Sequence, residues 1–308
     1  MDMSALKKYI EISPEVQDAL DHNKPIIAME TTIVAQGFPY PENVKMAHSL
    51  AQIARSMGVV PATIGILHGK IIVGMSDEQV EYMGSHCKEC PKASRRDLAA
   101  ILGLGLNGAS TSALVVLVAR MVGIDIFCTG GLGGVHRGAS ETFDISADLD
   151  ELGKTRCIVV SAGSKAILDL PKTLEYLETK GVGVFGWRTD ILPAFYSSTS
   201  PYKVDYRIDT VQQMVDIYRA QEALGIESGM MLCNPIEKEF EVPENTINPI
   251  IERAVHEAEA AGVHGKDSTP FILAKVKELS GGESMQANIK LVQSNVRLAS
   301  ELAIALKA

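Results

Sequence analysis

Short apolar segments alternate with amphipathic segments along the whole chain, and this alternation constrains the fold more than any other feature. Residues 62–67, 182–187 and 228–235 are apolar runs typical of buried strands, whereas residues 42–58 and 209–225 have the apolar spacing of amphipathic helices. Strands that alternate with helices are typical of a parallel or mixed sheet covered on both faces. The sequence therefore predicts an α/β protein, a three-layer α/β/α fold with a largely parallel or mixed central sheet. No linker or repeat interrupts the pattern, so we expect a single domain over residues 1–308.

Local signals predict where several helices begin and end. Ser76 and Gln79 have the three-residue spacing of a capping box, which predicts a helix over residues 76–84. Gly58 is placed to end the helix of residues 42–58. Three helices are expected to close the chain, and the last has an apolar stripe made of Ile289, Val292, Val296, Ala299 and Ala303.

Charge and composition argue against several kinds of partner. The net charge is −9 and aromatic residues make up only 5% of the chain, whereas nucleic acids and anionic membranes favour a basic face. No apolar run approaches a membrane span, and residues 1–20 lack the apolar core of a signal peptide. The five cysteines are scattered and odd in number, which suits a reducing compartment. We therefore expect a cytoplasmic protein without a nucleic-acid or membrane partner.

Cys87 and Cys90 form the only CxxC pair of the sequence. A structural zinc site normally needs a second pair of ligands, and the other three cysteines stand alone inside apolar runs. The pair is therefore a weak candidate for metal or redox chemistry.

Residues 103–108, GLGLNG, formally match the glycine pattern of a dinucleotide-binding turn. That turn must follow a strand and open a helix, whereas here it follows residues 95–102, which have a helical pattern. Asp125, about twenty residues further on, stands at the start of a strand and not at its end, where a ribose would be bound. We therefore do not expect a bound NAD.

Residues 129–149, TGGLGGVHRGASETFDISADL, hold four glycines in their first six positions and follow an apolar strand. Glycines let backbone N–H groups converge on an anion, and His136 and Arg137 add charge. The segment lacks the Lys-Ser/Thr ending of an ATP-binding P-loop. A tight surface turn is the alternative interpretation.

Asp144 and Asp148 stand four residues apart in the same segment. If they face one pocket, their hard oxygen atoms suit Mg²⁺ or Mn²⁺ with water in most coordination positions. The alternative is that they only complement the dipole at the start of a short helix that Ser146 caps, and spacing alone favours this second interpretation.

Lys165 lies just beyond the predicted strand of residues 156–164 and before an apolar stretch. A lysine held against apolar walls or near another cation loses proton affinity and becomes a candidate nucleophile. Lys92, Arg95 and Arg96 are candidates for that cation or for holding a substrate phosphate. A solvated surface lysine is the simpler alternative.

Glu30 ends the apolar run of residues 25–30. A carboxylate at the tip of an apolar strand is well placed to act as a general acid. An ordinary surface acid at a strand end explains the sequence equally well.

Six motifs together resemble the pseudouridine-5′-phosphate glycosidase family, which includes proteins named for indigoidine synthesis. The resemblance spans nearly the whole chain, in the family's order and without a large insertion. The motifs are METTIVAQGFPYPEN, PATIGILHGKIIVG, KASRRDL, TGGLGGVHRGASETFDISADL, SAGSKAILDLPKTLEYLET and DSTPFILAKVKELSGG.

The resemblance implies reversible cleavage of the C–C glycosidic bond of pseudouridine 5′-phosphate, giving uracil and ribose 5-phosphate. A carbon leaving group departs less readily than the oxygen leaving group of ordinary glycosidases. In the family, a lysine amine bonded to C1′ of the ring-opened ribose provides the electron sink.

Matched by position, the family's nucleophile falls on Lys165, its proton donor on Glu30 and its metal-associated carboxylate on Asp144, with Mn²⁺ as the expected cofactor. Further positions are implied to bind phosphate, sugar or uracil. They are Lys92, Ser112, His136, Ser146, Ala147, Asp148 and Asn288.

The resemblance also implies an α/β/α fold and a homotrimer. The sequence departs from the family at Thr31, where serine is common, and at Gln36, where histidine is common. Gln36 has no titratable group, which puts any proton transfer at that position in doubt. A phosphosugar-binding protein without turnover and a related enzyme with another base are the alternative hypotheses, and the presence of Lys165 and Glu30 argues against the first.

Overall fold

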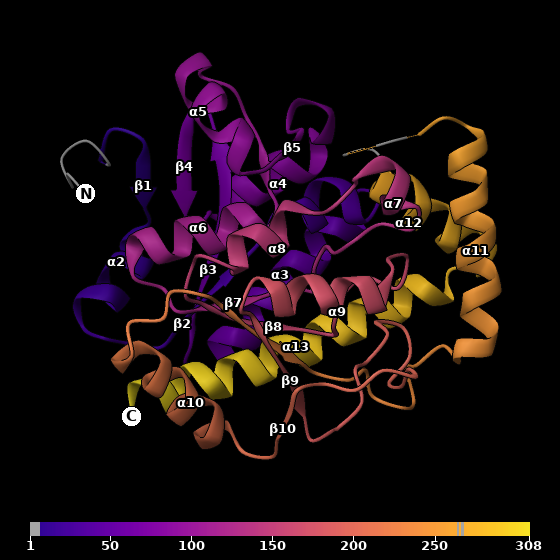
Figure 1. Cartoon of the computed structure of the whole chain (residues 1–308). Helices are drawn as coiled ribbons and strands as arrows, with labels where there is room; N and C mark the ends of the chain where they lie inside the picture. Colours follow the sequence, from indigo (N-terminus) through magenta and orange to yellow (C-terminus); the bar gives the residue numbers. More distant parts are fainter. Residues whose placement is uncertain (1–6, 264, 266–267) are drawn as a thin grey trace. The chain divides into compact units, whose positions relative to one another are not determined.

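The computed structural model describes residues 7–263, 265 and 268–308, and Figure 1 labels its helices and strands. The last of the six motifs begins at Asp267, which lies outside the described residues, as do residues 1–6 of the N-terminal segment.

The chain divides into two units, each built around parallel strands and helices. The first unit comprises Met1–Cys128 and Ala299–Ala308, and the second comprises Thr129–Leu298. The single domain expected over residues 1–308 stays a prediction.

The sheet of the first unit is mixed. Its strands follow the order β1-β4-β3-β2-β7, and only the neighbours β3 and β4 are antiparallel. These two strands are joined by a turn in which His68 and Gly69 both have positive φ. A separate parallel pair, β5 and β6, completes the strands of this unit. The bounds are β1 (Ile10–Ile12), β2 (Ile26–Met29), β3 (Val60–Leu67), β4 (Lys70–Val73), β5 (Lys92–Ala93), β6 (Ala109–Ser110) and β7 (Ile126–Cys128).

Helices of the first unit pack against this sheet: α2 and α3 contact β3, and α6 contacts β2 and β7. The capping box of Ser76 and Gln79 is formed at the start of α4, as predicted. The bounds are α2 (Pro14–Asp21), α3 (Glu42–Ser56), α4 (Asp77–Ser85), α5 (Arg95–Leu104), α6 (Ser112–Val122), the π-helix η1 (Ile33–Gly37) and the 3₁₀-helix η2 (Cys87–Glu89).

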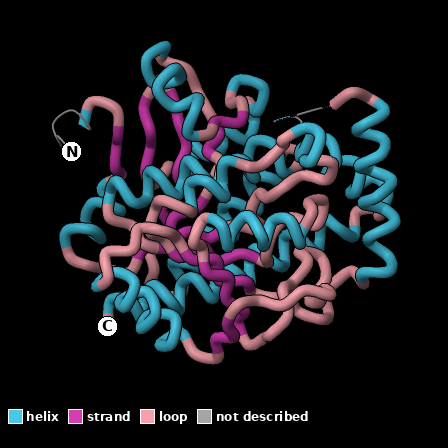
Figure 2. The backbone as a smooth tube through the Cα atoms, viewed as in Figure 1, coloured by secondary structure: helices cyan, strands magenta, loops and turns pink. Residues whose placement is uncertain are grey.

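The sheet of the second unit is wholly parallel and has the order β8-β11-β9-β10. Every residue of β8 (Ile158–Ser161) and β11 (Met230–Cys233) is buried. Between β9 (Gly183–Trp187) and β10 (Tyr206–Ile208) runs a long connection without a helix, drawn as loop in Figure 2.

Helices make up most of the rest of the second unit. α9 contacts β9 and α10 contacts β10, whereas α11 and α12 contact each other. The closing helix α13 begins in this unit and ends in the first, and of its predicted stripe only Ile289 is not fully buried. The bounds are α7 (Ala139–Thr142), α8 (Ala147–Leu152), α9 (Leu170–Thr179), α10 (Val211–Ala223), α11 (Glu244–Ala260), α12 (Ser268–Leu279) and α13 (Glu283–Lys307).

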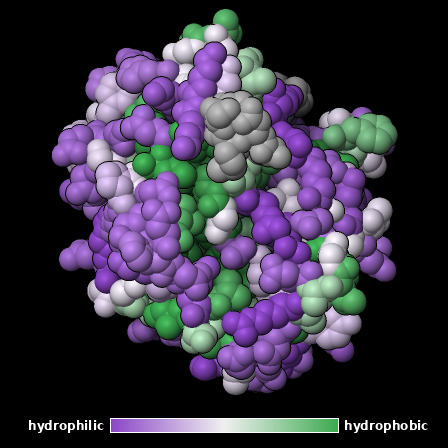
Figure 3. Space-filling view, turned by 90° about the vertical axis from the view of Figure 1, so that its left-hand side faces the viewer, coloured by the Kyte–Doolittle hydropathy of each residue, from purple (hydrophilic) through white to green (hydrophobic). Residues whose placement is uncertain are grey.

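The predicted α/β class with a parallel or mixed sheet between helices is confirmed. The face shown in Figure 3 is largely hydrophilic, with hydrophobic side chains reaching the surface mainly near its middle. Within the part of the chain that the structure describes, no helix combines the length and apolarity that a membrane crossing requires.

Candidate functional site

The glycine-rich segment, residues 129–135, is buried, so the alternative of a tight surface turn is wrong. It follows β7 directly, and several of its N–H groups bond to protein acceptors: that of Leu132 to the Gly163 carbonyl at 3.1 Å and that of Gly133 to Asp148 Oδ2 at 2.9 Å. Glycine is required at position 131 because a Cβ atom there would lie 2.6 Å from the Phe195 ring. The glycines therefore allow close packing of the segment against its neighbours.

The two aspartates of the adjoining segment have different surroundings. Ser146 caps α8, and its Oγ accepts the N–H of Asp148 at 3.2 Å. The Asp148 side chain is buried, 6% exposed, and points to Gly133. Asp144 precedes the helix and lines a pocket of about 600 Å³, whose described lining does not include Asp148. Ala147, the first residue of α8, is exposed.

The pocket that Asp144 lines has a polar side and an apolar side. His136 Nδ1 lies 3.9 Å from Asp144 Oδ2, and Arg137 lies beside them in the lining. The apolar side comes from residues that the sequence did not single out: Ile167, Val255, Ala258, Val263 and Ile272. A concave pocket with a few convergent polar groups is typical of a small-molecule site.

Two carboxylates of the described residues line this pocket, Asp144 and Glu259, and Asp144 is the one beside His136. Mg²⁺ and Mn²⁺ prefer oxygen ligands and keep several waters. Among the described residues, no three His, Cys, Asp or Glu side chains are grouped to hold a metal ion between them. The donor set therefore fits a cation bound through one carboxylate, with water or substrate oxygens completing its coordination.

Lys165 lies in the loop after β8, and its backbone is fixed to the glycine-rich segment. Its N–H donates to the Leu132 carbonyl at 3.0 Å, and its carbonyl accepts the N–H of Leu168 at 3.0 Å. The residues on either side, Ser164 and Ala166, are buried, whereas Lys165 is only half-buried. Among the described residues, no acid forms an ion pair with its amine.

Asn288, on α13, reaches the same segment. A Cβ atom on Gly130 would lie 3.3 Å from Asn288 Oδ1. This oxygen is buried and accepts no hydrogen bond from the described residues. A buried polar atom without a partner is unusual in a folded protein and is explained most simply by a ligand or an ordered water.

In the first unit, Glu30 follows β2 and is buried, 8% exposed. The next residue joins this strand end to β6, because the Thr31 N–H donates to Ser110 Oγ at 3.1 Å and the Ser110 N–H donates to Thr31 Oγ1 at 2.9 Å. Burial, and secondarily the charge of Glu30, raises the pKa of the Cys128 thiol at the end of β7.

Lys92 and Ser112 lie on neighbouring elements of this unit. Lys92 pairs with Ala109 in the β5–β6 ladder, and the Thr111 N–H donates to the Ala93 carbonyl at 3.0 Å. Ser112, 2% exposed, is the first residue of α6, whose side-chain cap is Thr111. Ser110 of β6 also bonds Thr31, the residue after Glu30. The end of β2, the pair β5 and β6 and the start of α6 therefore lie together in this unit, and with them Glu30, Lys92 and Ser112. The amino end of α6 adds the partial positive charge that suits an anion.

The weaker motifs of this unit have structural explanations. All five cysteines are free thiols, and burial, followed by the nearby Cys87, raises the pKa of Cys90 to about 11, which keeps its thiol protonated near neutral pH. Gln36, in η1, donates from Nε2 to the Cys90 carbonyl at 3.0 Å. Gly105 ends α5 in a left-handed conformation, so GLGLNG follows a helix, as predicted.

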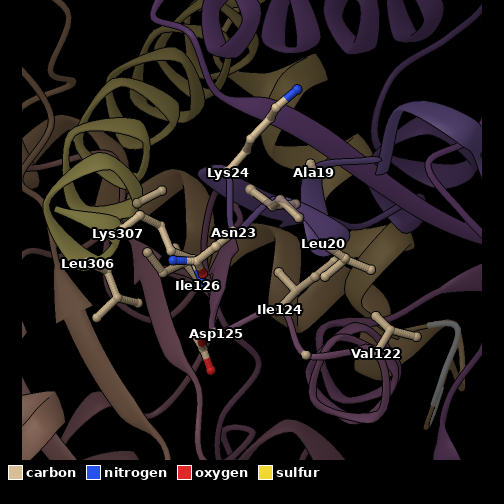
Figure 4. A pocket seen from close by; sticks show the side chains of 13 residues that line it. Ala19, Leu20, Asn23, Lys24, Val122, Ile124, Asp125, Ile126, Leu306 and Lys307 are labelled. Atoms are coloured by element: carbon tan, nitrogen blue, oxygen red, sulfur yellow. The ribbon is translucent and has the colours of Figure 1, made fainter. Parts of the chain in front are cut away.

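A second pocket, of about 310 Å³, lies in the first unit at the amino ends of β2 and β7 (Figure 4). Lys24 pairs with Asp18 at 2.6 Å, and in Figure 4 its side chain extends away from the other labelled residues. Ligands of parallel sheets usually bind at the carboxyl ends of the strands, and none of the predicted site residues lines this pocket.

Comparison with known proteins identifies the family. Residues 15–305 match the family described as indigoidine synthase A like protein. The chain belongs to this family. It is 52% identical to the pseudouridine-5′-phosphate glycosidase of Clostridium botulinum, over 98% of both chains.

Two solved structures have a similar fold. The indigoidine synthase A-like protein of Thermotoga maritima has a TM-score of 0.88 and 36% identity, over 97% of both chains. The prealnumycin C-glycosynthase AlnA, solved in complex with ribulose 5-phosphate, has a TM-score of 0.89 and 35% identity, also over 97% of both chains.

Proposed function

We propose that this chain is a pseudouridine-5′-phosphate glycosidase, which with water splits pseudouridine 5′-phosphate reversibly into uracil and ribose 5-phosphate. The relative from Clostridium botulinum has this name at 52% identity, and the related glycosynthase binds a five-carbon sugar phosphate. The observation that carries the proposal is the half-buried Lys165 amine, which has no acid partner among the described residues and whose backbone is bonded to a buried glycine-rich segment.

Lys165 is the proposed nucleophile. Its amine bonds to C1′ of the ribose while the bond between C1′ and the ring oxygen breaks, so that the sugar opens. The electron pair of the C1′–C5 bond then passes to uracil, whose carbon takes a proton, and the lysine nitrogen forms an iminium with C1′. Water adds to this iminium and releases ribose 5-phosphate, which returns the free amine.

Glu30 is the proposed proton donor for the ring oxygen as the sugar opens. A carboxyl group is one of the side chains that serve as general acids. Its position at the end of β2 fixes the carboxyl group on a rigid element.

The remaining residues are proposed to bind the substrate. Lys92, with the amino end of α6 at Ser112, suits a phosphate group. The Asn288 amide both donates and accepts, which matches the edge of uracil. The proposed sugar and phosphate contacts near the glycine-rich segment are His136, Ser146, Ala147 and Asp148.

Asp144 is proposed to hold Mn²⁺. When bound there, the cation supplies positive charge that orients oxygen atoms of the substrate. We also propose, on the resemblance to the family, that the protein is a cytoplasmic homotrimer whose ligands are small phosphosugars and a base.

Reduction with borohydride tests the proposal. With ribose 5-phosphate present, borohydride should convert the iminium into a stable amine, and peptide mass mapping should find the adduct on Lys165. Lys165→Ala should release no uracil and keep its fold by circular dichroism, and Lys154→Ala, which changes an exposed lysine of the same unit, should behave as the wild type. An adduct on another lysine would refute the assignment, and binding of ribose 5-phosphate without adduct or turnover would indicate a binding protein.

A further inference from the structure

Phe195 has an unusual conformation in the long connection between β9 and β10. It is buried, 2% exposed, and its φ is +63°. A bulky residue with positive φ is an outlier and persists only where the surroundings fix it. Such residues are often found at functional sites.

Contacts on several sides fix this conformation. The Phe195 N–H donates to the Ala162 carbonyl at 3.2 Å, and the Ala194 N–H donates to the Ser197 carbonyl at 3.0 Å. The Tyr196 ring packs edge-on against Phe195, with the ring centroids 4.7 Å apart, and Tyr196 is hydrogen-bonded to Ser284 of α13. The backbone of this short stretch is therefore held by the loop after β8, and the Tyr196 side chain reaches α13.

The Phe195 ring lies against the glycine-rich segment. A Cβ atom on Gly131 would lie 2.6 Å from two atoms of the ring. The same Cβ would lie 3.3 Å from the Gly163 carbonyl, so the ring, Gly131 and the loop after β8 meet at one point. This contact explains why position 131 excludes any side chain.

The loop after β8 leads directly to Lys165. The Ala162 N–H donates to the Gly130 carbonyl at 2.9 Å, and the Lys165 N–H donates to the Leu132 carbonyl at 3.0 Å. On its other side, Gly163 faces the Pro193 carbonyl, which would lie 2.5 Å from a Cβ atom there. The loop thus lies between the glycine-rich segment and the connection that contains Phe195.

We propose that Phe195 is a positioning residue for Lys165: its ring holds Gly131 against the loop after β8 and so fixes where the lysine amine meets C1′. The inference rests on the proposed function of Lys165. Small misplacements of a reacting group reduce its rate strongly, because reaction requires a near-attack geometry. Phe195 touches no reacting atom in this account and acts through the backbone of residues 131 and 162–165.

The test compares Phe195→Leu with Tyr196→Phe. In Phe195→Leu we expect kcat for uracil release to fall about 10–100-fold while KM changes less than about threefold, since only the lysine is misplaced. The rate of borohydride trapping with ribose 5-phosphate should fall by the same factor as kcat. Tyr196→Phe removes the hydroxyl group bonded to Ser284 and keeps the ring, so its kcat should stay near that of the wild type.

A double substitution tests whether the contact between the Phe195 ring and Gly131 is responsible for the loss. Gly131→Ala should also lower kcat, because its methyl group meets the Phe195 ring. In Gly131→Ala/Phe195→Leu the methyl group enters the space that the ring leaves. The kcat of the double variant should therefore be higher than the two single losses, taken as independent, would predict. Phe195→Met is measured in parallel, and circular dichroism checks that each variant is folded.

The outcomes distinguish the two proposals. Absence of uracil release from the wild type would refute the proposed function. Wild-type activity together with unchanged kcat and trapping in folded Phe195→Leu and Phe195→Met would overturn the positioning role alone. A fall in kcat without recovery in the double variant would also overturn it, because the loss would then not come from the contact between the Phe195 ring and Gly131.

Discussion

At the scale of single residues, the proposed binding of Mn²⁺ depends on Asp144. Its carboxylate lines the pocket beside His136. Asp144→Asn keeps the shape and removes the charge, so the Mn²⁺ concentration for half-maximal uracil release should rise at least about tenfold. The measurement is activity after treatment with a chelator, followed by titration with Mn²⁺.

Asp150→Asn is the matched control for this experiment. Asp150 lies on α8 and pairs with Lys180 at 2.6 Å, and it does not line the pocket. Its Mn²⁺ titration should match that of the wild type. Full activity of the wild type after chelation, or equal titrations for Asp144→Asn and the wild type, would contradict the assignment of Asp144.

The residue types at the candidate site were predictable, but their surroundings were not. Glu30 and Lys165 stand out in the sequence because each follows an apolar strand, and both follow strands in the structure. Nothing near Phe195 in the sequence signals its role, because its contacts at Gly131 and Ala162 come from segments more than thirty residues away. The separate surroundings of Asp144 and Asp148 likewise depend on tertiary packing.

At the scale of elements, one ion pair joins the helices α2 and α3. Arg55 donates to both carboxylate oxygens of Glu15, at 3.0 and 2.8 Å. This bonding lowers the pKa of Glu15 below its ordinary value of 4.5. A carboxyl group with a lowered pKa in the folded state adds stability above its unfolded pKa, and this stability is lost as the pH falls through the folded pKa.

Arg55→Met should therefore lower the free energy of unfolding by about 0.5 kcal/mol at pH 7, a modest value because the pair is partly exposed. The difference from the wild type should shrink as the solution becomes acidic and Glu15 is protonated in both states. Urea unfolding at a series of pH values measures it. In a Glu15→Gln background the effect of Arg55→Met should not depend on pH in the acidic range, and a persisting dependence there would exclude Glu15 as its source.

The larger elements were predictable because their signals are local. Apolar periodicity predicted most of the longer helices and most strands, and the capping box at Ser76 marked the start of α4. The short strands β1, β5, β6 and β10, the helices α2 and α7 and the π-helix η1 were not predicted. Such short elements depend on backbone partners elsewhere in the chain, so the local sequence carries little signal for them.

At the scale of the whole molecule, the free energy of unfolding depends in part on Asn288 Oδ1, a buried acceptor without a partner among the described residues. An unsatisfied buried polar atom costs about 1–3 kcal/mol. Asn288→Leu removes the atom and keeps a similar volume, so the ligand-free protein should gain about 1 kcal/mol of stability. Thermal unfolding measures this change, and Gln286→Leu, at an exposed position of the same helix, serves as the control. A melting temperature below that of the wild type would contradict the prediction.

The consequence of Asn288 extends to binding. A ligand that donates a hydrogen bond to this oxygen gains the bond and also relieves a deficit of the empty protein. On the proposed role of Asn288, binding of the ligand recovers stability that the native state gives up at this position. In Asn288→Leu we expect uracil to raise the melting temperature less than in the wild type. The more stable variant is then the one that uracil stabilises less.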